Sequence, residues 1–250
     1  DCASTDKPCR PINQCFLRLG PMTALVGLKT RLRLARLALV VPPDRSDPEA
    51  ADFAAHGVDL LILTRGDRSV EEAAAVVDVA RRRLFGLQTI VATDSPDVGE
   101  ASRADVVFYR RPGWRPFGFR RPHEFSLLGR SIDGADEAGK VDGDPFNFAF
   151  VGPAVRDGRV SDEVAEMARQ YPPMALPATP VWFAAGGIEP DNLGEVLVAG
   201  ARRVAVSTAV FRAADPFAVT QELSAALRAA WHAEPGAEDY GKDAFNASAG

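Results

Sequence analysis

One repeated pattern limits what this chain can fold into. From Leu37 onward, a short aliphatic run is followed by a turn rich in Asp, Gly, Ser or Pro, and then by an amphipathic stretch with helical spacing. Repetition of such units predicts an α/β protein with parallel strands, and eight units favour a single closed (β/α)8 TIM barrel. The predicted strands are Leu37–Val41, Val58–Leu63, Thr89–Ala92, Val106–Tyr109, Leu127–Ser131, Phe146–Val151, Val181–Ala184 and Val204–Ser207.

Several helix starts are marked by capping residues. Ser46, Ser69 and Ser161 each precede acidic residues at the start of an amphipathic stretch, so each start combines a capping oxygen with negative charge in the first turn. The fourth and fifth units are less regular, because Arg110–Pro122 is a long loop and little helix follows it. An open sheet with fewer strands is therefore the alternative fold.

Both ends of the chain differ from the repeating body. Residues 1–21 show no periodicity and hold all three cysteines, and residues 232–250 lack a sustained apolar face. We predict a disordered extension or upstream translated segment at 1–21, a barrel domain at 22–231 and a mobile tail at 232–250. Because the body has no cysteine, it has no disulfide framework, which is typical of a cytoplasmic protein.

Charge and hydropathy bear on the partners that the chain can bind. A formal net charge of -5 does not favour a nucleic-acid or membrane surface bound through net charge, whereas a small anionic ligand remains compatible. No apolar run reaches the length of about 18 residues that a transmembrane helix needs. The loop 110–121 carries five arginines among aromatic residues and could clamp an anionic substrate or stack on single-stranded nucleic acid. The net negative charge of the chain disfavours nucleic acid as the partner. The oligomeric state stays open, a homo-oligomer included.

The most informative stretch runs from Val181 to Phe211. One aliphatic strand ends at Gly186 and Gly187, and the next ends at Ser207 and Thr208. Paired glycines expose backbone N–H groups, and the second turn adds further N–H groups and hydroxyls. Since barrel enzymes often hold phosphate in the loops after strands seven and eight, we expect these residues to surround one phosphate group. The simpler interpretation, in which the glycines turn the chain and the hydroxyls cap the next segment, stays open.

The same stretch resembles a known family. Residues 180–192, Pro-Val-Trp-Phe-Ala-Ala-Gly-Gly-Ile-Glu-Pro-Asp-Asn, and residues 204–211, Val-Ala-Val-Ser-Thr-Ala-Val-Phe, resemble the thiamine-phosphate synthase and thiazole tautomerase family, whose fold is this barrel. The resemblance extends more weakly over residues 37–216. It implies a synthase that joins hydroxymethylpyrimidine diphosphate to thiazole phosphate and releases diphosphate, which magnesium holds. The residues implied to bind the thiazole phosphate are Gly186, Gly187, Ser207, Thr208 and Gly152.

The implied catalytic half departs from the family pattern. The family carries Gln-x-Arg-x-Lys after strand two, where this chain has Ile62, Thr64 and Gly66, so contacts to the pyrimidine and the diphosphate are missing. Asp94 retains one expected magnesium carboxylate, but Gly113 stands where a second acidic ligand belongs. The magnesium site that the resemblance implies is therefore incomplete.

Other residues are retained or are candidates to replace the missing groups. Ser131 keeps an implied catalytic position after strand five, but the family's Ser-Thr-His continues here as Ser-Ile-Asp, which removes the histidine that a tautomerase uses. Arg159 lies near the place of a family lysine. For each candidate arginine, a solvated surface position is the ordinary alternative. Arg65 and Ser131 are the candidate catalytic residues. The arginines that could bind the diphosphate in place of the missing cations are Arg110, Arg111 and Arg130.

The sequence supports two hypotheses of different class. The first is a transferase of the thiamine-phosphate synthase type with altered diphosphate contacts. The second is a noncatalytic or functionally diverged barrel that binds thiamine phosphate or another phosphorylated metabolite, because one barrel supports many chemistries. Turnover distinguishes the first from the second.

Overall fold

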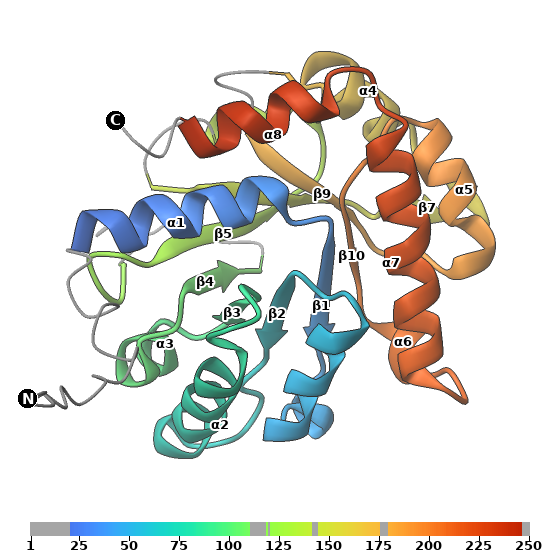
Figure 1. Ribbon diagram of the computed structural model, residues 1–250. Coiled ribbons are helices and arrows are strands. Elements are labelled where there is room, and N and C mark those ends of the chain that lie inside the picture. The colour runs from blue at the N-terminus through green and yellow to red at the C-terminus, as the bar shows by residue number, and fades with distance from the viewer. Residues whose placement is uncertain (1–20, 111–118, 120, 142–144, 176–179, 247–250) are drawn as a thin grey trace, which may run out of the picture.

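The computed structural model describes residues 21–110, 119, 121–141, 145–175 and 180–246. Within them, eight parallel strands close into a barrel in the order β1-β10-β9-β6-β5-β4-β3-β2 (Figure 1). Every predicted strand overlaps one of these eight, so the predicted closed barrel is confirmed and the open sheet is not formed. The barrel strands are β1 (Leu37–Val41), β2 (Leu60–Leu63), β3 (Ile90–Thr93), β4 (Val106–Tyr109), β5 (Leu127–Ile132), β6 (Phe148–Val151), β9 (Val181–Ala185) and β10 (Val204–Val206).

Helices surround the barrel, and a short antiparallel hairpin follows β6. The α-helices are α1 (Pro21–Leu34), α2 (Val70–Leu84), α3 (Pro96–Ser102), α4 (Asp162–Gln170), α5 (Pro190–Val198), α6 (Thr208–Phe211), α7 (Pro216–His232) and α8 (Ala237–Asn246). The 3-10 helices are η2 (Pro43–Arg45), η3 (Pro48–His56) and η4 (Ala135–Lys140), and the hairpin pairs β7 (Val155–Arg156) with β8 (Arg159–Val160).

The strands are apolar along their length because both faces of the sheet are buried. The inner face contributes four phenylalanines, and the ring centroids of Phe108 and Phe150 lie 4.4 Å apart while those of Phe148 and Phe183 lie 6.0 Å apart. Alternate residues such as Leu61 pack outward in the separate cluster that includes residues of the surrounding helices. This two-sided burial explains why the sequence shows continuous aliphatic runs rather than alternation of apolar and polar residues.

The predicted helix starts differ in their outcome. The Ser69 hydroxyl accepts the Glu72 amide at 3.1 Å and the Glu72 carboxylate accepts the Ser69 amide at 3.0 Å, which confirms a helix start there and completes a capping box. The prediction for Ser46 is wrong, since Asp47 caps η3 by accepting two main-chain amides at 2.9 and 3.1 Å. Ser46 is buried instead, and its hydroxyl donates to the Val41 carbonyl at 3.3 Å. At Ser161, the side chain makes no capping hydrogen bond.

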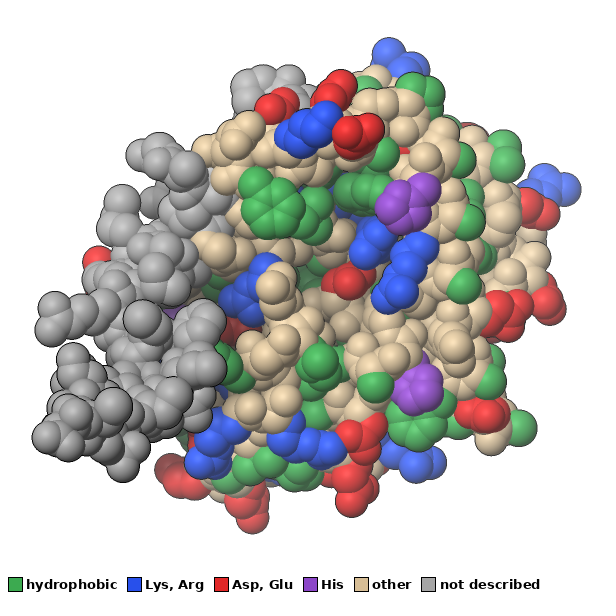
Figure 2. All heavy atoms as spheres, viewed as in Figure 1, with side chains coloured by type: hydrophobic (Ala, Val, Ile, Leu, Met, Phe, Trp, Pro, Cys, Tyr) green, Lys and Arg blue, Asp and Glu red, His purple; other side chains and the backbone are tan. Residues whose placement is uncertain are grey.

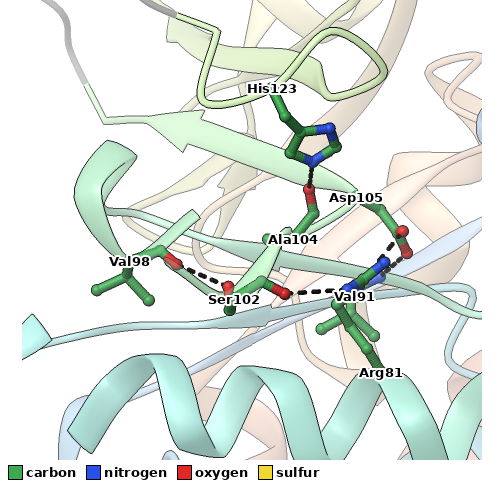
Figure 3. Close-up of polar contacts among 7 residues, drawn as sticks. All are labelled: Arg81, Val91, Val98, Ser102, Ala104, Asp105 and His123. Carbon is green, nitrogen blue, oxygen red and sulfur yellow. Dashed lines mark hydrogen bonds and ion pairs between the residues drawn. The ribbon is translucent and has the colours of Figure 1, made fainter. Parts of the chain in front are cut away.

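Polar side chains fasten the amino end of the barrel. Asp59, Asp105 and Asn147 stand just before β2, β4 and β6, and each accepts main-chain N–H groups at the start of the preceding strand. Figure 3 shows one of these contacts, in which Asp105 accepts the Val91 amide at 3.0 Å while Arg81 lies beside the same carboxylate. These carboxylate and amide oxygens satisfy backbone donors, which is typical of the barrel face that serves stability.

The last helix differs from the expectation for the C-terminal segment. Within residues 232–250, where the sequence predicts a mobile tail, residues 237–246 form α8, which lies beside α1 (Figure 1). Tyr240 and Ala244 are buried, and the Thr30 hydroxyl donates to the Ala244 carbonyl at 3.0 Å. The apolar face of α8 is too short to be visible in the sequence. Arg203, a buried residue distant in sequence, completes the contacts of this face by donating to the Tyr240 hydroxyl at 2.9 Å.

The surface in the view of Figure 2 carries interspersed acidic and basic side chains rather than a field of one sign. No helix in the described ranges is long and apolar enough to cross a membrane.

Candidate functional site at the carboxyl end of the barrel

A cavity of about 500 Å³ opens where five neighbouring strands, β10, β1, β2, β3 and β4, reach their carboxyl ends. It brings Asp94, Arg110 and Ser207 to one space, although they come from three separate parts of the chain. In barrel enzymes the carboxyl end carries the chemistry. The residues that line this cavity are Val40, Pro42, Pro43, Thr64, Gly66, Asp94, Pro96, Tyr109, Arg110 and Ser207.

A second cavity, of about 580 Å³, lies beyond the carboxyl ends of β5 and β6. The β7–β8 hairpin and the start of α4 form most of it, and it holds the only two arginines that the described hairpin strands contain, Arg156 and Arg159. The other lining residues are Asp133, Pro153, Val160, Ser161, Asp162 and Glu163. The two cavities therefore open at the same end of the barrel, over different strands.

The glycine turn after β9 has a defined geometry. Gly186 and Gly187 have positive φ angles of 94° and 73°, a conformation that favours glycine. Their carbonyls accept hydrogen bonds from the Val155 amide at 3.0 Å and from the Asn192 side-chain amide at 2.9 Å. Both glycines are exposed, and within the described residues their own N–H groups donate to no protein acceptor. Two oriented backbone donors are thus available to a ligand.

Close packing explains why a side chain is not accepted in this turn. A Cβ added to Gly187 would lie 2.4 Å from the Val155 carbonyl oxygen, so the hairpin and the glycine turn fit against each other only without it. The turn after the adjacent strand β10 carries Ser207 and Thr208. Ser207 caps no helix with its side chain, and Thr208 is exposed. The two turns that the sequence singled out therefore end neighbouring strands.

Gly152 has another role than the sequence resemblance implies. Its amide donates to the Ile132 carbonyl at 3.2 Å, so this N–H group is not available to a phosphate. A Cβ at Gly152 would lie 1.9 Å from the Ala185 carbonyl oxygen. The glycine is required by the close approach of the chain after β6 to the end of β9, and we exclude it from the amide donors.

The end of β2 is filled by packing where the family carries cations. The Thr64 hydroxyl donates to the Val41 carbonyl at 2.6 Å, and the Thr64 amide donates to the Ser46 hydroxyl at 3.0 Å. Gly66 has a φ of 60°, and a Cβ there would lie 2.5 Å from Cβ of Pro43. Since Thr64 is buried and Gly66 is pressed against a proline ring, neither position presents a positive charge to the cavity.

Asp94 lies half-buried after β3 and is held by a backbone donor. Its Oδ1 accepts the Arg65 amide at 2.8 Å. The Arg65 guanidinium is used locally, because its Nε donates to the Arg68 carbonyl at 2.7 Å, and Arg65 does not line the cavity that holds Asp94. The structure therefore joins Arg65 to Asp94 through the main chain rather than through the predicted cationic side chain.

The donor set around Asp94 does not fit a dedicated magnesium site. Magnesium prefers oxygen ligands in an octahedron, and carboxylates are its usual protein ligands. Asp94 is the only acidic residue among the described residues that line its cavity, one of its oxygens accepts an amide, and the cation Arg110 lines the same space. Among the described residues, no three His, Cys, Asp or Glu side chains group to hold a metal. The loop 110–122 contains none of these residue types.

The remaining predicted residues are distributed unequally. Arg110 is exposed and its side chain makes no hydrogen bond or ion pair with a described residue, whereas Arg111 lies outside the described residues. Arg130 lies on the outer face of β5, with its guanidinium 5.1 Å from the ring centroid of Phe146, and lines neither cavity. The alternation of the strand turns it away from the mouth, so we exclude it as a diphosphate ligand. Ser131 is half-buried on the opposite, inner face.

The hairpin was missed in the sequence. Asp157 and Gly158 both have positive φ, 51° and 72°, as a two-residue hairpin turn requires. The Asp-Gly pair was the signal for it. Its strands present Arg156 and Arg159 as exposed cross-strand neighbours. The pKa of Glu163 is lowered, chiefly by its own main-chain amide, and the charge of Arg156 adds to the shift.

Comparison with characterised sequences gives a consistent result. The chain is 32% identical over 220 residues to a thiamine-phosphate synthase of Thermobifida fusca, covering 81% of this chain and 97% of that protein. It is also 32% identical over 223 residues to a thiamine-phosphate synthase of Mycolicibacterium vanbaalenii, covering 80% of this chain and 97% of that protein. No protein-family model matches the sequence.

Solved structures support the fold. A thiamine phosphate pyrophosphorylase from Pyrococcus furiosus superposes with a TM-score of 0.67 at 20% identity, covering 81% of this chain and 98% of that one. A thiamine phosphate pyrophosphorylase from Bacteroides thetaiotaomicron gives a TM-score of 0.57 at 15% identity, covering 78% of this chain and 98% of that one. At these identities the structural likeness concerns the barrel fold.

Proposed function

Since this chain belongs to the thiamine-phosphate synthase family, we propose that it condenses hydroxymethylpyrimidine diphosphate with thiazole phosphate at the carboxyl end of the barrel. The observation that carries the proposal is the cavity of about 500 Å³ in which Ser207, Asp94 and Arg110 meet. A hydroxyl from the turn after β10, a carboxylate and a guanidinium with no partner among the described residues therefore line one space. Both proposed substrates are phosphorylated small molecules.

The reaction exchanges one bond for another. The bond between the pyrimidine methylene carbon and the diphosphate oxygen breaks, and its electron pair leaves with the diphosphate. The ring nitrogen of the thiazole donates its lone pair to the methylene carbon, which forms the new carbon–nitrogen bond. Because negative charge develops on the leaving group, fixed donors or cations aimed at it lower the barrier.

The glycine turn and the turn after β10 are the proposed phosphate cradle. The unpaired amides of Gly186 and Gly187 would donate to the phosphate of the thiazole, with the hydroxyls of Ser207 and Thr208 beside them. Asn192 holds this turn by donating to the Gly187 carbonyl and accepting the Glu189 amide, each at 2.9 Å. Preorganised donors bind the phosphate without the cost of ordering the loop on binding.

Ser131 remains a proposed polar contact for the reacting rings, because it stands on the inner face of β5 near the mouth. Asp94 is proposed to position the loop after β2 rather than to supply one of several carboxylates to a metal, since its donor set is incomplete.

The test of this function is a coupling assay. Purified full-length chain is incubated with hydroxymethylpyrimidine diphosphate and thiazole phosphate, with and without Mg²⁺, and thiamine phosphate and released diphosphate are measured together. Equal amounts of both products, lost in the Ser207→Ala, Thr208→Ala double variant, would support the proposal. Absence of product at enzyme concentrations equal to that of substrate would overturn it.

A second function is favoured by one observation, the packed end of β2. Thr64 is engaged with the Val41 carbonyl and Gly66 has no room for a side chain, so the family's cationic contacts are missing there. A barrel with this change could bind thiamine phosphate or another phosphorylated metabolite without turnover. Calorimetry with thiamine phosphate and thiazole phosphate, run beside the coupling assay, separates the two: binding without product supports the second function.

Location and assembly belong to the same proposal. A cysteine-free body from residue 16 onward suits the reducing cytoplasm, where we propose that the protein works. A homo-oligomer is likewise a prediction, which light scattering of the purified chain tests.

A further inference from the structure

We propose that guanidinium groups, rather than a magnesium ion held by the chain, neutralise the diphosphate at this site. The inference rests on the proposed function, in which diphosphate is the leaving group. It names Arg110, at the end of β4, and the hairpin pair Arg156 and Arg159 as the groups that bind it.

The groups that line the cavity favour an anion over a metal ion. One cavity pairs a single carboxylate, Asp94, with a cation, Arg110, and the Arg65 amide already donates to that carboxylate. A magnesium ion at Asp94 would be repelled by a neighbouring guanidinium, while a diphosphate would be attracted by it. The charge arrangement therefore suits an anion that approaches Arg110 more than a second cation.

The guanidinium groups of these arginines have no partner among the described residues. The side chains of Arg110, Arg156 and Arg159 form no hydrogen bond and no ion pair there, although the Arg156 charge contributes to the lowered pKa of Glu163. Two other candidate arginines have partners within the protein, since the Arg65 side chain donates to the Arg68 carbonyl and the Arg130 guanidinium lies over the ring of Phe146. The fork of donors on each unpaired guanidinium matches a pair of phosphate oxygens.

The strand order of the barrel places Arg110 and the hairpin arginines at the same end of the molecule. Only β5 separates β4 from β6 in the barrel, so the ends of these strands lie about 10 Å apart, two interstrand spacings. Arg110 follows β4, and the hairpin follows β6. The hairpin is fixed at its base, since the Val155 amide donates to the Gly186 carbonyl at 3.0 Å and the Ser161 amide to the Ala154 carbonyl at 2.9 Å. Both positions thus stand at the carboxyl end of the barrel, and the proposed ligand lies between their two cavities at the mouth.

Acidic residues also line the hairpin cavity: Asp133, Asp162 and Glu163. Asp162 and Glu163 belong to the first turn of α4, where the helix amides stabilise their charge. They limit how deeply a diphosphate enters this cavity. We therefore expect the diphosphate at the rim, between the hairpin arginines and Arg110, rather than at the start of α4.

The experiment measures binding of inorganic diphosphate by calorimetry, once in EDTA and once in excess Mg²⁺, with the full chain. We expect dissociation constants that agree within about threefold between the two conditions. Arg110→Gln and the double variant Arg156→Gln, Arg159→Gln should each weaken binding about tenfold or more in EDTA. Arg110→Lys should recover only part of the affinity, because lysine keeps the charge but not the fork of donors.

The matched control is Arg82→Gln, an exposed arginine on α2 whose guanidinium lies 2.6 Å from the Asp78 carboxylate. It should bind diphosphate like the parent chain. Thermal unfolding of every variant checks that the fold is kept, which is expected because all substituted arginines are exposed. Three results would each overturn the inference. They are diphosphate binding by the parent chain that is about tenfold or more weaker in EDTA than in excess Mg²⁺, parent-like binding by the arginine variants, and no diphosphate binding by the parent chain.

The outcome separates the inference from the proposed function. Metal-independent, arginine-dependent diphosphate binding without any coupling of the two substrates would leave the inference standing and remove the function. If both the coupling reaction and diphosphate binding require Mg²⁺, the proposed function would stand and the inference would be removed.

Discussion

The main-chain amide of Arg65 donates a 2.8 Å hydrogen bond to Oδ1 of Asp94, which ties the loop after β2 to the end of β3. This contact gives Asp94 a structural task within the cavity it lines. The same loop is held from its other side, where the Thr64 hydroxyl donates to the Val41 carbonyl. The ends of β1, β2 and β3 are therefore joined by side chains at positions where the family resemblance expects contacts to substrate or metal.

Asp94→Ala should lower the free energy of unfolding by about 1–2 kcal/mol, because it leaves the Arg65 amide without its acceptor. Asp94→Asn keeps a carbonyl oxygen at the position and should lose less. Urea denaturation measures both. Asp67→Asn, an exposed change in the same loop, is the control. Equal effects of Asp94→Ala and Asp67→Asn would show that the Arg65 contact contributes nothing.

Gly187→Ala should damage the cradle. The added Cβ would meet the Val155 carbonyl oxygen at 2.4 Å at a position whose φ is positive, so we expect a loss of about 1–3 kcal/mol in stability. Displacement of the amide should also weaken thiazole phosphate binding about tenfold or more. Gly194→Ala, in α5 with free space around it, should be neutral or add about 0.5–1 kcal/mol. Calorimetry and thermal unfolding compare the Gly187→Ala and Gly194→Ala variants. Equal stability and equal affinity for thiazole phosphate in the two variants would contradict the cradle geometry.

Restoring a lysine at position 66 should fail. Gly66→Lys brings a Cβ to 2.5 Å from Cβ of Pro43 at a φ of 60°, so stability should fall by about 1–3 kcal/mol. Diphosphate affinity should not rise. Asp67→Lys adds a lysine to the next, exposed position and controls for charge. A Gly66→Lys variant that is as stable as the parent and binds diphosphate more tightly would refute this account of the β2 end.

Tyr240→Phe should loosen α8. The Tyr240 hydroxyl accepts from the buried Arg203 guanidinium at 2.9 Å, and burial lowers the pKa of Arg203, so each lost partner makes its charge more costly to hold. We expect a loss of about 1–2 kcal/mol and faster hydrogen exchange in residues 237–246. Phe245→Ala, at a site whose side chain is 63% exposed, should stay within about 0.5 kcal/mol. Unchanged exchange in the Tyr240→Phe variant would mean that α8 is held by other contacts.

Local patterns were sufficient to predict the eight strands of the barrel, although not the short hairpin that follows β6. Continuous aliphatic runs predicted all eight, because a strand buried on both faces needs apolar residues at successive positions. The capping box at Ser69 was also visible, since it depends on residues three apart. Paired glycines and adjacent hydroxyls predicted which two turns would end neighbouring strands, as Gly186 and Ser207 do.

The tertiary structure alone decided which predicted groups are available for chemistry. The sequence offered Arg65 as a catalytic cation and Arg110 and Arg130 as diphosphate ligands. Folding bonded the first to a carbonyl, left the second in a cavity and turned the third outward over an aromatic ring. Gly152 likewise lost its amide to the Ile132 carbonyl. The physical reason is that strand identity depends on neighbours in sequence, while the availability of a donor or a charge depends on which distant groups the closed barrel brings within hydrogen-bonding distance.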